Sequence, residues 1–125
     1  MLTSTIFTFI EDRPLDIAIL VDWSTYQTAE HWQYIQDYLQ NYVDQLKISS
    51  DDKADHVSLI GYSSKAGVVF NFKDSQNASD IKRRIRELDR QKGYRRPDEA
   101  LKLVRSDIFT PAGGARSEAR KVELF

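Results

Sequence analysis

Cysteine is absent from the 125 residues of the chain, and only two histidines are present. Disulfide bonds, thiol catalysis and zinc sites built from thiolates are therefore excluded. The histidines, His31 and His56, fall on different predicted elements without a matching set of ligands, so we interpret both as structural. The five glycines form no phosphate-binding loop, and no nucleophile has a histidine at a recognisable spacing. The sequence therefore predicts a protein that is not an enzyme.

Long apolar runs are absent as well. No segment reaches the roughly 18 apolar residues that a membrane-spanning helix needs, so we expect no insertion into a membrane. Residues 1–10 are weakly apolar and carry no charge, so no signal peptide is evident in this chain. Export would therefore depend on a signal that lies outside this chain or has been removed.

The net charge of the chain is only −1, but the two signs are separated along the sequence. Residues 1–81 hold 12 acidic side chains against 5 basic ones, whereas residues 82–105 hold 10 basic against 4 acidic. Hydrophobic residues make up 41% of the chain and charged residues 30%, which is the range of globular proteins. We expect one domain, or part of one, with an acidic end and a basic end.

Residues 15–21 are the segment around which we expect the fold to form. Six of these seven residues are apolar, and the run lies between Pro14 and a polar turn. This pattern is typical of a central strand that is buried on both faces. Asp22 follows directly, and open α/β sheets place their ligand sites at the carboxyl ends of strands. The sequence therefore predicts that a local function lies near Asp22.

The next elements follow from periodicity and turn length. Apolar residues recur at helical spacing after Thr28, a plausible cap, and predict a helix that reaches about Leu46. Residues 56–62 and 67–72 have the composition of strands. Because only residues 63–66 separate them, these strands should pair as an antiparallel hairpin.

Three further elements are expected. A helix is predicted over residues 79–91, ended by Gly93, and another begins at Pro97, which suits a first helical turn. Residues 121–125 resemble the start of another strand. Near the amino terminus, residues 3–10 alternate loosely, so they are either a short flanking strand or disordered.

Four stretches carry a resemblance to the von Willebrand factor type A domains of matrix proteins such as collagen VI and the matrilins. They are 15–22, 56–63, 99–101, and 108–111 running through 114–116 to Lys121 and Val122. The last is the most specific. The resemblance implies an α/β fold with a Rossmann-like three-layer open sheet, incomplete after the start of the fourth strand. It assigns residues 1–14 to a flanking segment and residues 15–125 to a partial domain of this family.

Such domains typically bind protein partners through a metal ion at the carboxyl edge of the sheet. The family motif is D-x-S-x-S after the first strand, with a Thr before the third helix and an Asp after the fourth strand, because a hard divalent cation prefers oxygen ligands. Asp22 and Ser24 match the first two ligands. Tyr26 stands in place of the second Ser, Arg95 stands in place of the Thr, and the Asp would lie beyond Phe125. We therefore expect no Mg²⁺ site and no other cofactor.

A sharper hypothesis concerns the two arginines of the loop before the third helix. The guanidinium of Arg95 or Arg96 would replace the cation by pairing with Asp22; the alternative is that both arginines are solvated loop residues. Trp23 is either an exposed contact residue or is packed beneath the loop. The candidate partner-binding residues at this edge are Trp23, Tyr26, Tyr94, Arg95 and Arg96.

The resemblance implies a non-enzymatic protein-interaction or adhesion module of an extracellular matrix protein, secreted as part of a larger protein. The implied partner is collagen or another matrix protein. In the family the fourth strand lies beside the first, and here only residues 121–125 would cover that side. An uncovered edge favours aggregation, so we predict that the chain is a fragment or splice form, or that self-association or a partner completes its sheet.

Two other features carry alternatives. The basic segment 82–96 would bind a heparin-like polyanion electrostatically, or it is simply a solvated helix face. Asn77-Ala78-Ser79 is a sequon for N-linked glycosylation. Its Asn77 is either a glycosylation site in a secreted chain or a residue that caps a turn or helix.

Overall fold

The computed structural model describes residues 13–125, and these form a mixed open sheet in the order β3-β2-β1-β4. The central strand is β1 (Leu15–Asp22), as the sequence predicted. It pairs in parallel with β2 (His56–Tyr62) on one side and with β4 (Arg120–Leu124) on the other. The short β3 (Ala66–Phe70) pairs antiparallel with β2, which confirms the predicted hairpin.

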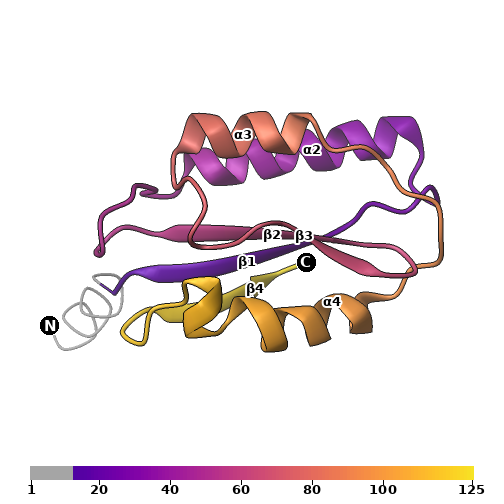
Figure 1. The fold of residues 1–125 in the computed structure, drawn as a ribbon. Helices are drawn as coiled ribbons and strands as arrows, with labels where there is room; N and C mark the ends of the chain where they lie inside the picture. The colour runs from indigo at the N-terminus through magenta and orange to yellow at the C-terminus, as the bar shows by residue number, and fades with distance from the viewer. Residues whose placement is uncertain (1–12) are drawn as a thin grey trace, which may run out of the picture.

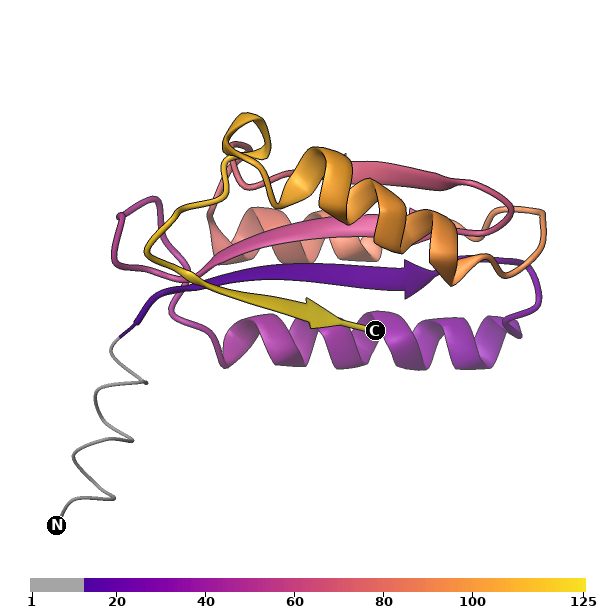
Figure 2. The same ribbon diagram turned by 90° about the horizontal axis from the view of Figure 1, so that it is seen from below.

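Helices cover both faces of the sheet (Figure 1). On one face lie α2 (Ala29–Asp44) and α3 (Ala78–Arg86), side by side and along the strands. On the other face lies α4 (Pro97–Leu103), which continues into a π-helical turn, Val104–Ile108. Figure 2 shows α4 in front of the sheet and α2 behind it. The three layers confirm the expected α/β open-sheet class.

The strand β1 supplies both halves of the core, which explains the apolar run from Ile17 to Val21. Ile17, Ile19 and Val21 point to the cluster beneath α2 and α3, whereas Ala18 and Leu20 point to the cluster beneath α4. All five side chains are buried. Because side chains on both faces of β1 enter a core, residues 17–21 are apolar at every position and do not alternate with a period of two.

The amino-terminal end of the sheet is closed by a buried charge network. Asp16 on β1 is fully buried, and its carboxylate lies 2.8 Å from Arg116 Nη2 and 3.3 Å from Lys121 Nζ. The backbone N–H of Arg116 donates to the same carboxylate at 2.7 Å. Arg116 also donates to the carbonyl oxygens of Asp52, Ala54 and Leu15. The network therefore joins β1 to the loop that precedes β4.

One predicted helix is shorter than expected. The sequence predicted a helix over 79–91 ended by Gly93, but α3 ends at Arg86. The cause comes from α2, where Gln36 Nε2 lies within hydrogen-bonding distance of carbonyl oxygens at the end of α3: those of Ile85 at 2.9 Å, Arg86 at 3.2 Å and Leu88 at 3.2 Å. After the carbonyl groups that Gln36 contacts, the chain is no longer helical, and Gln91 forms an isolated parallel β-bridge with Ser24.

Two expectations concern other parts of the chain. Within residues 13–125, no helix is both long and apolar enough to cross a membrane. The flanking strand considered for residues 3–10 lies outside the described residues.

Candidate functional site

The carboxyl ends of β1 and β2 meet at one edge of the sheet, where three loops converge. Asp22 ends β1 and lies opposite Tyr62 at the end of β2. The next peptide continues this pairing, since the N–H of Trp23 donates to the carbonyl oxygen of Tyr62 at 3.1 Å. The bridge between Ser24 and Gln91 brings in the segment after α3. We call this region the Asp22 edge.

At the Asp22 edge, both carboxylate oxygens of Asp22 have partners. Oδ1 accepts a hydrogen bond from the backbone N–H of Ser24 at 2.9 Å. Oδ2 lies 3.0 Å from Nε of Arg95, with the Asp22 side chain 15% exposed and the Arg95 side chain 51% exposed. The carboxylate is therefore mostly shielded from water, whereas the guanidinium reaches from it towards solvent.

The guanidinium of Arg95 also lies over an aromatic ring. Its Cζ is 5.2 Å from the ring centroid of Tyr26, a cation–π distance. Tyr26 is 59% exposed. Asp22, Arg95 and Tyr26 thus form a continuous group that runs from the end of the central strand to the surface.

Arg96 has different partners. Its guanidinium lies 2.8 Å from Asp98 and 3.4 Å from Glu99, both on α4, while its backbone N–H donates to the carbonyl oxygen of Ser63. The hydrogen bond to Asp98, together with its charge, raises the pKa of Arg96, and the same bond lowers the pKa of Asp98. Of the two arginines considered for Asp22, the structure therefore pairs Arg95 and places Arg96 at the start of α4.

Trp23 is packed beneath the loop, which is one of the two alternatives left open by the sequence. A Cβ atom on Gly61 would lie 2.1 Å from the indole ring, so only glycine fits there. The ring also lies against Gly67, and its Nε1 is buried. The indole of Trp23 therefore packs against β2 and β3, next to the Asp22 edge. The exposed aromatic residues at this edge are Tyr26 and Tyr94, the latter 71% exposed.

Ser24 occupies an unusual position. It is fully buried, and within the described part of the chain its Oγ has no hydrogen-bond partner. Ser24 stands at the sequence position of the family's second metal ligand, but its side chain points into the protein. Asp22, at the position of the first ligand, is already paired with Arg95.

Sequence reasoning missed Tyr62 at this edge. Burial raises the pKa of Tyr62, and the negative charge of Asp22 adds to that rise, while Arg95 opposes it. The signal was available, because two parallel strands of similar length predict that the residues ending them lie opposite each other. Sequence reasoning also missed Gln27, whose backbone carbonyl oxygen accepts a hydrogen bond from the guanidinium of Arg90.

The basic segment is largely engaged within the protein. Its side chains contact acidic groups, carbonyl oxygens or an aromatic ring, most of them on neighbouring elements: Lys82 with Asp44, Arg83 with Glu87 of the same segment, Arg84 with the Val69 carbonyl and the Phe70 ring, Arg86 with Gln40 and Arg90 with the Gln27 carbonyl. Polyanion binding by residues 82–96 stays a prediction, but fewer of its side chains are free to contact a ligand than the sequence suggests.

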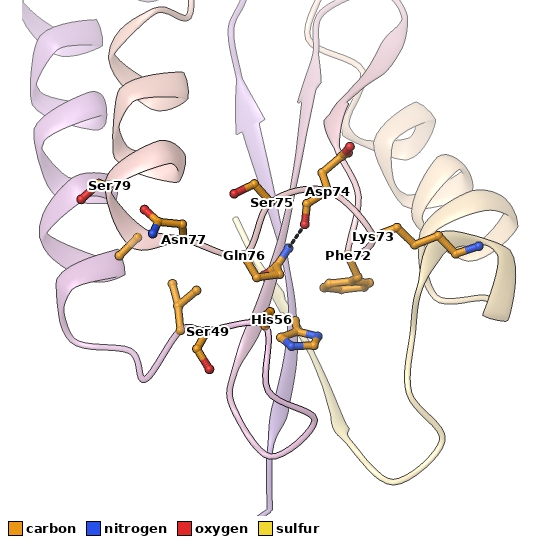
Figure 3. A pocket seen from close by; sticks show the side chains of 12 residues that line it. Ser49, His56, Phe72, Lys73, Asp74, Ser75, Gln76, Asn77 and Ser79 are labelled. Atoms are coloured by element: carbon orange, nitrogen blue, oxygen red, sulfur yellow. Dashed lines mark hydrogen bonds between the residues drawn. The ribbon is translucent and has the colours of Figure 1, made fainter.

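The opposite end of the sheet holds a second polar region, at the start of β2 and of α3. Asn77 Oδ1 accepts a hydrogen bond from the backbone N–H of Asp80 at 3.2 Å, so Asn77 caps α3. Beside it lies a cavity of about 700 Å³, shown in Figure 3. We call this cavity the α3 trough.

With this geometry in view, the comparisons with known proteins identify the family. The model of the von Willebrand factor type A domain matches residues 16–125, and the chain belongs to that family. Collagen alpha-4(VI) chain from Mus musculus is 32% identical over 108 residues, which are 86% of this chain and 5% of that protein. Matrilin-1 from Homo sapiens is 30% identical over 109 residues, which are 87% of this chain and 22% of that protein. The resemblance to collagen VI and matrilins is thus confirmed.

A solved structure shows the same fold. Proximal thread matrix protein 1 from the mussel byssus, in the form with a zinc-occupied MIDAS motif, superposes with a TM-score of 0.81 at 23% identity. The match covers 90% of this chain and 30% of that chain. The curated relatives are non-enzymatic matrix proteins of the extracellular space, and this chain spans a small part of their length.

Proposed function

We propose that this domain is a protein-interaction module of an extracellular matrix or adhesion protein, and that it binds its partner through the Asp22 edge without a metal ion. The observation that carries the proposal is the 3.0 Å ion pair between Arg95 and Asp22. Family membership supports the class of function, because the relatives are matrix proteins.

The donor set at the Asp22 edge does not suit a divalent cation. Both Asp22 oxygens already have partners, and one of these partners is a guanidinium, whose fixed positive charge repels a cation. Tyr26 contacts that guanidinium through its ring face. The unpaired Oγ of Ser24 is a single neutral oxygen, too few to hold a hard cation that takes six or more oxygen ligands. Arg95 therefore provides the positive charge that the metal ion provides elsewhere in the family.

The exposed part of the edge has the chemistry of a protein contact. Arginine and tyrosine are enriched among the residues that contribute most to binding energy. Tyr26 and Arg95 lie in contact at the surface, and Tyr94 is exposed beside Arg95 in the chain. Within residues 13–125, Asp22 is the only carboxylate paired with Arg95, and the contact is made through Nε. The other N–H groups of the Arg95 guanidinium therefore remain available to hydrogen-bond acceptors on a partner.

The experiment is to measure binding of the chain to immobilised fibrillar collagen by surface plasmon resonance, in excess EDTA and in excess Mg²⁺. We expect equal affinity in the two buffers, and a loss of about tenfold for Arg95→Ala or Tyr26→Ala, a change typical of a residue at the centre of an interface. Arg105→Ala, which removes an exposed arginine near the end of α4, should bind normally.

The outcomes separate the parts of the proposal. Binding that EDTA abolishes would contradict the metal-free mechanism. Binding that survives Arg95→Ala and Tyr26→Ala would contradict the Asp22 edge as the contact surface. A folded chain that does not bind collagen would contradict collagen as the partner.

A further inference from the structure

The α3 trough lies at the end of the sheet opposite the Asp22 edge. It contains His56, the first residue of β2, whereas Tyr62 at the other end of β2 lies at the Asp22 edge. One wall is the start of α3, and the facing wall is the loop that follows α2. Figure 3 shows Asn77 and Ser79 on the first wall and Ser49 on the second.

The base of the trough is held in one conformation. The side chain of Gln76 accepts a hydrogen bond from the N–H of Val57 at 2.7 Å and donates to the carbonyl oxygen of the same residue at 3.1 Å. Its Nε2 also lies 3.3 Å from the carbonyl oxygen of Asp74, the contact drawn in Figure 3. A side chain bonded at three points does not reorganise when a ligand arrives, so the base is a preformed surface.

The lining of the trough is rich in hydroxyl and other small polar groups. Ser49, Ser50 and Ser79 are exposed, and Lys73 adds an ammonium group. Hydroxyls both donate and accept hydrogen bonds, so they match a ligand that itself carries many hydroxyls. The polar lining therefore suits a carbohydrate better than an apolar ligand.

Asn77 stands at the rim of the trough with one side of its amide free. Its Oδ1 is used for the N–H of Asp80, and within the described residues its Nδ2 has no hydrogen-bonded partner. Asn77 is exposed, and so is Ser79, the hydroxyl residue of the sequon. In N-linked glycosylation, Nδ2 loses one proton and bonds to C1 of a glycan, and the lipid pyrophosphate that carried the glycan leaves. The cap and the modification therefore use different atoms of the same side chain.

We propose that Asn77 carries an N-linked glycan whose first sugars lie in the α3 trough. The proposal rests on the extracellular location proposed above, because the modification occurs during export. The glycan covers the end of the sheet where β2 begins and leaves the Asp22 edge uncovered. Binding at that edge and occupancy of the trough are thus separate properties of one domain.

Occupancy is tested by secreting residues 1–125 from cultured mammalian cells behind a cleavable leader and measuring the intact mass before and after treatment with peptide N-glycosidase F. We expect one glycan, lost in both Asn77→Asp and Ser79→Ala. Asn77→Asp is the matched control for folding, because an aspartate also caps a helix. A secreted chain without any glycan, alongside a glycosylated control protein from the same cells, would overturn the proposal.

Seating of the sugars in the trough is tested by thermal melting. Trimming the glycan to its first two sugars should leave Tm unchanged, whereas removing these two sugars should lower Tm by about 2 °C or more. The double variant Ser49→Ala and Lys73→Ala should abolish this difference, and in the unglycosylated Asn77→Asp background it should leave Tm unchanged. A glycan whose removal does not alter Tm would overturn the seating. Collagen binding reports on the Asp22 edge independently, so failure of one proposal is distinguishable from failure of the other.

Discussion

Asp22 shows how a single side chain can retain its position while its partner changes. The carboxylate stands at the end of the central strand, as the family motif requires, but it is paired with Arg95. A carboxylate that is 85% shielded would be costly to leave without a counterion. The arginine removes that cost, and the ring of Tyr26 lies within cation–π distance of the same guanidinium.

The strength of this pair can be measured by a double-mutant cycle. We expect a coupling free energy of about 1 kcal/mol between Asp22→Asn and Arg95→Ala in urea unfolding, because one partner is shielded and the other is half exposed. Asp22→Asn combined with Arg105→Ala is the control and should show additive effects. Additive effects for Asp22 and Arg95 would mean that the pair contributes nothing to the folded state.

For individual residues, the sequence identified the candidates at the Asp22 edge but did not decide which of them are in contact. The sequence offered a pairing of Asp22 with Arg95 or Arg96, without choosing between them, as one alternative; the other was that both arginines are solvated loop residues. The choice depends on Asp98 and Glu99, which take Arg96, and on Ser63, which holds its backbone. These contacts follow from the way the loop enters α4, and a linear pattern does not contain that geometry.

Among the elements, β1 and β4 depend on each other through Asp16. Their parallel pairing is short, and the loop before β4 brings Arg116 and Lys121 onto the buried carboxylate. Removing one partner of a buried pair leaves a charge without compensation in a region of low dielectric. The contact between these strands should therefore be sensitive to a single substitution.

We expect Arg116→Met to lower the free energy of unfolding by about 3 kcal/mol, because Lys121 would be the only cationic side chain left beside the buried Asp16 carboxylate. Chemical denaturation monitored by circular dichroism measures the change. Arg120→Ala removes an exposed arginine from β4 and should cost less than about 0.5 kcal/mol. Equal effects of the two substitutions would contradict a special role for the buried pair.

The elements also show where sequence patterns succeed and where they fail. The strand at 15–21, the hairpin and the cap at Thr28 were predictable because each depends on neighbouring residues. The end of α3 was not, because the group that caps it is Gln36, about fifty residues earlier in the chain. A polar residue on the inner face of α2 gave no local sign of this role.

Considered as a whole, the sheet ends on one side in β4, whose outer edge pairs with no described strand. β4 pairs with β1 and lies at the end of the strand order. Near it, Tyr34, Tyr38 and Phe125 are exposed and line a cavity of about 210 Å³. Unpaired strand edges next to apolar side chains favour association between chains.

We therefore predict that the 125-residue chain self-associates in solution, which sedimentation velocity at increasing concentration would detect. Tyr38→Glu should weaken the association about tenfold, because a charge at an apolar contact must be desolvated. Tyr94→Glu changes an exposed tyrosine at the Asp22 edge and should not affect it. A single monomeric species at every concentration would contradict this prediction.

Arg95 has one more consequence for the proposed function in the extracellular matrix. A metal ion binds from the surrounding fluid and can be removed by chelation or dilution. A guanidinium, in contrast, is covalently part of the chain and stays charged at physiological pH. If binding at the Asp22 edge uses Arg95 in place of a metal ion, the ability of this edge to bind a partner is present as soon as the polypeptide has folded. Changes in the mineral content of the matrix would then neither activate it nor release it.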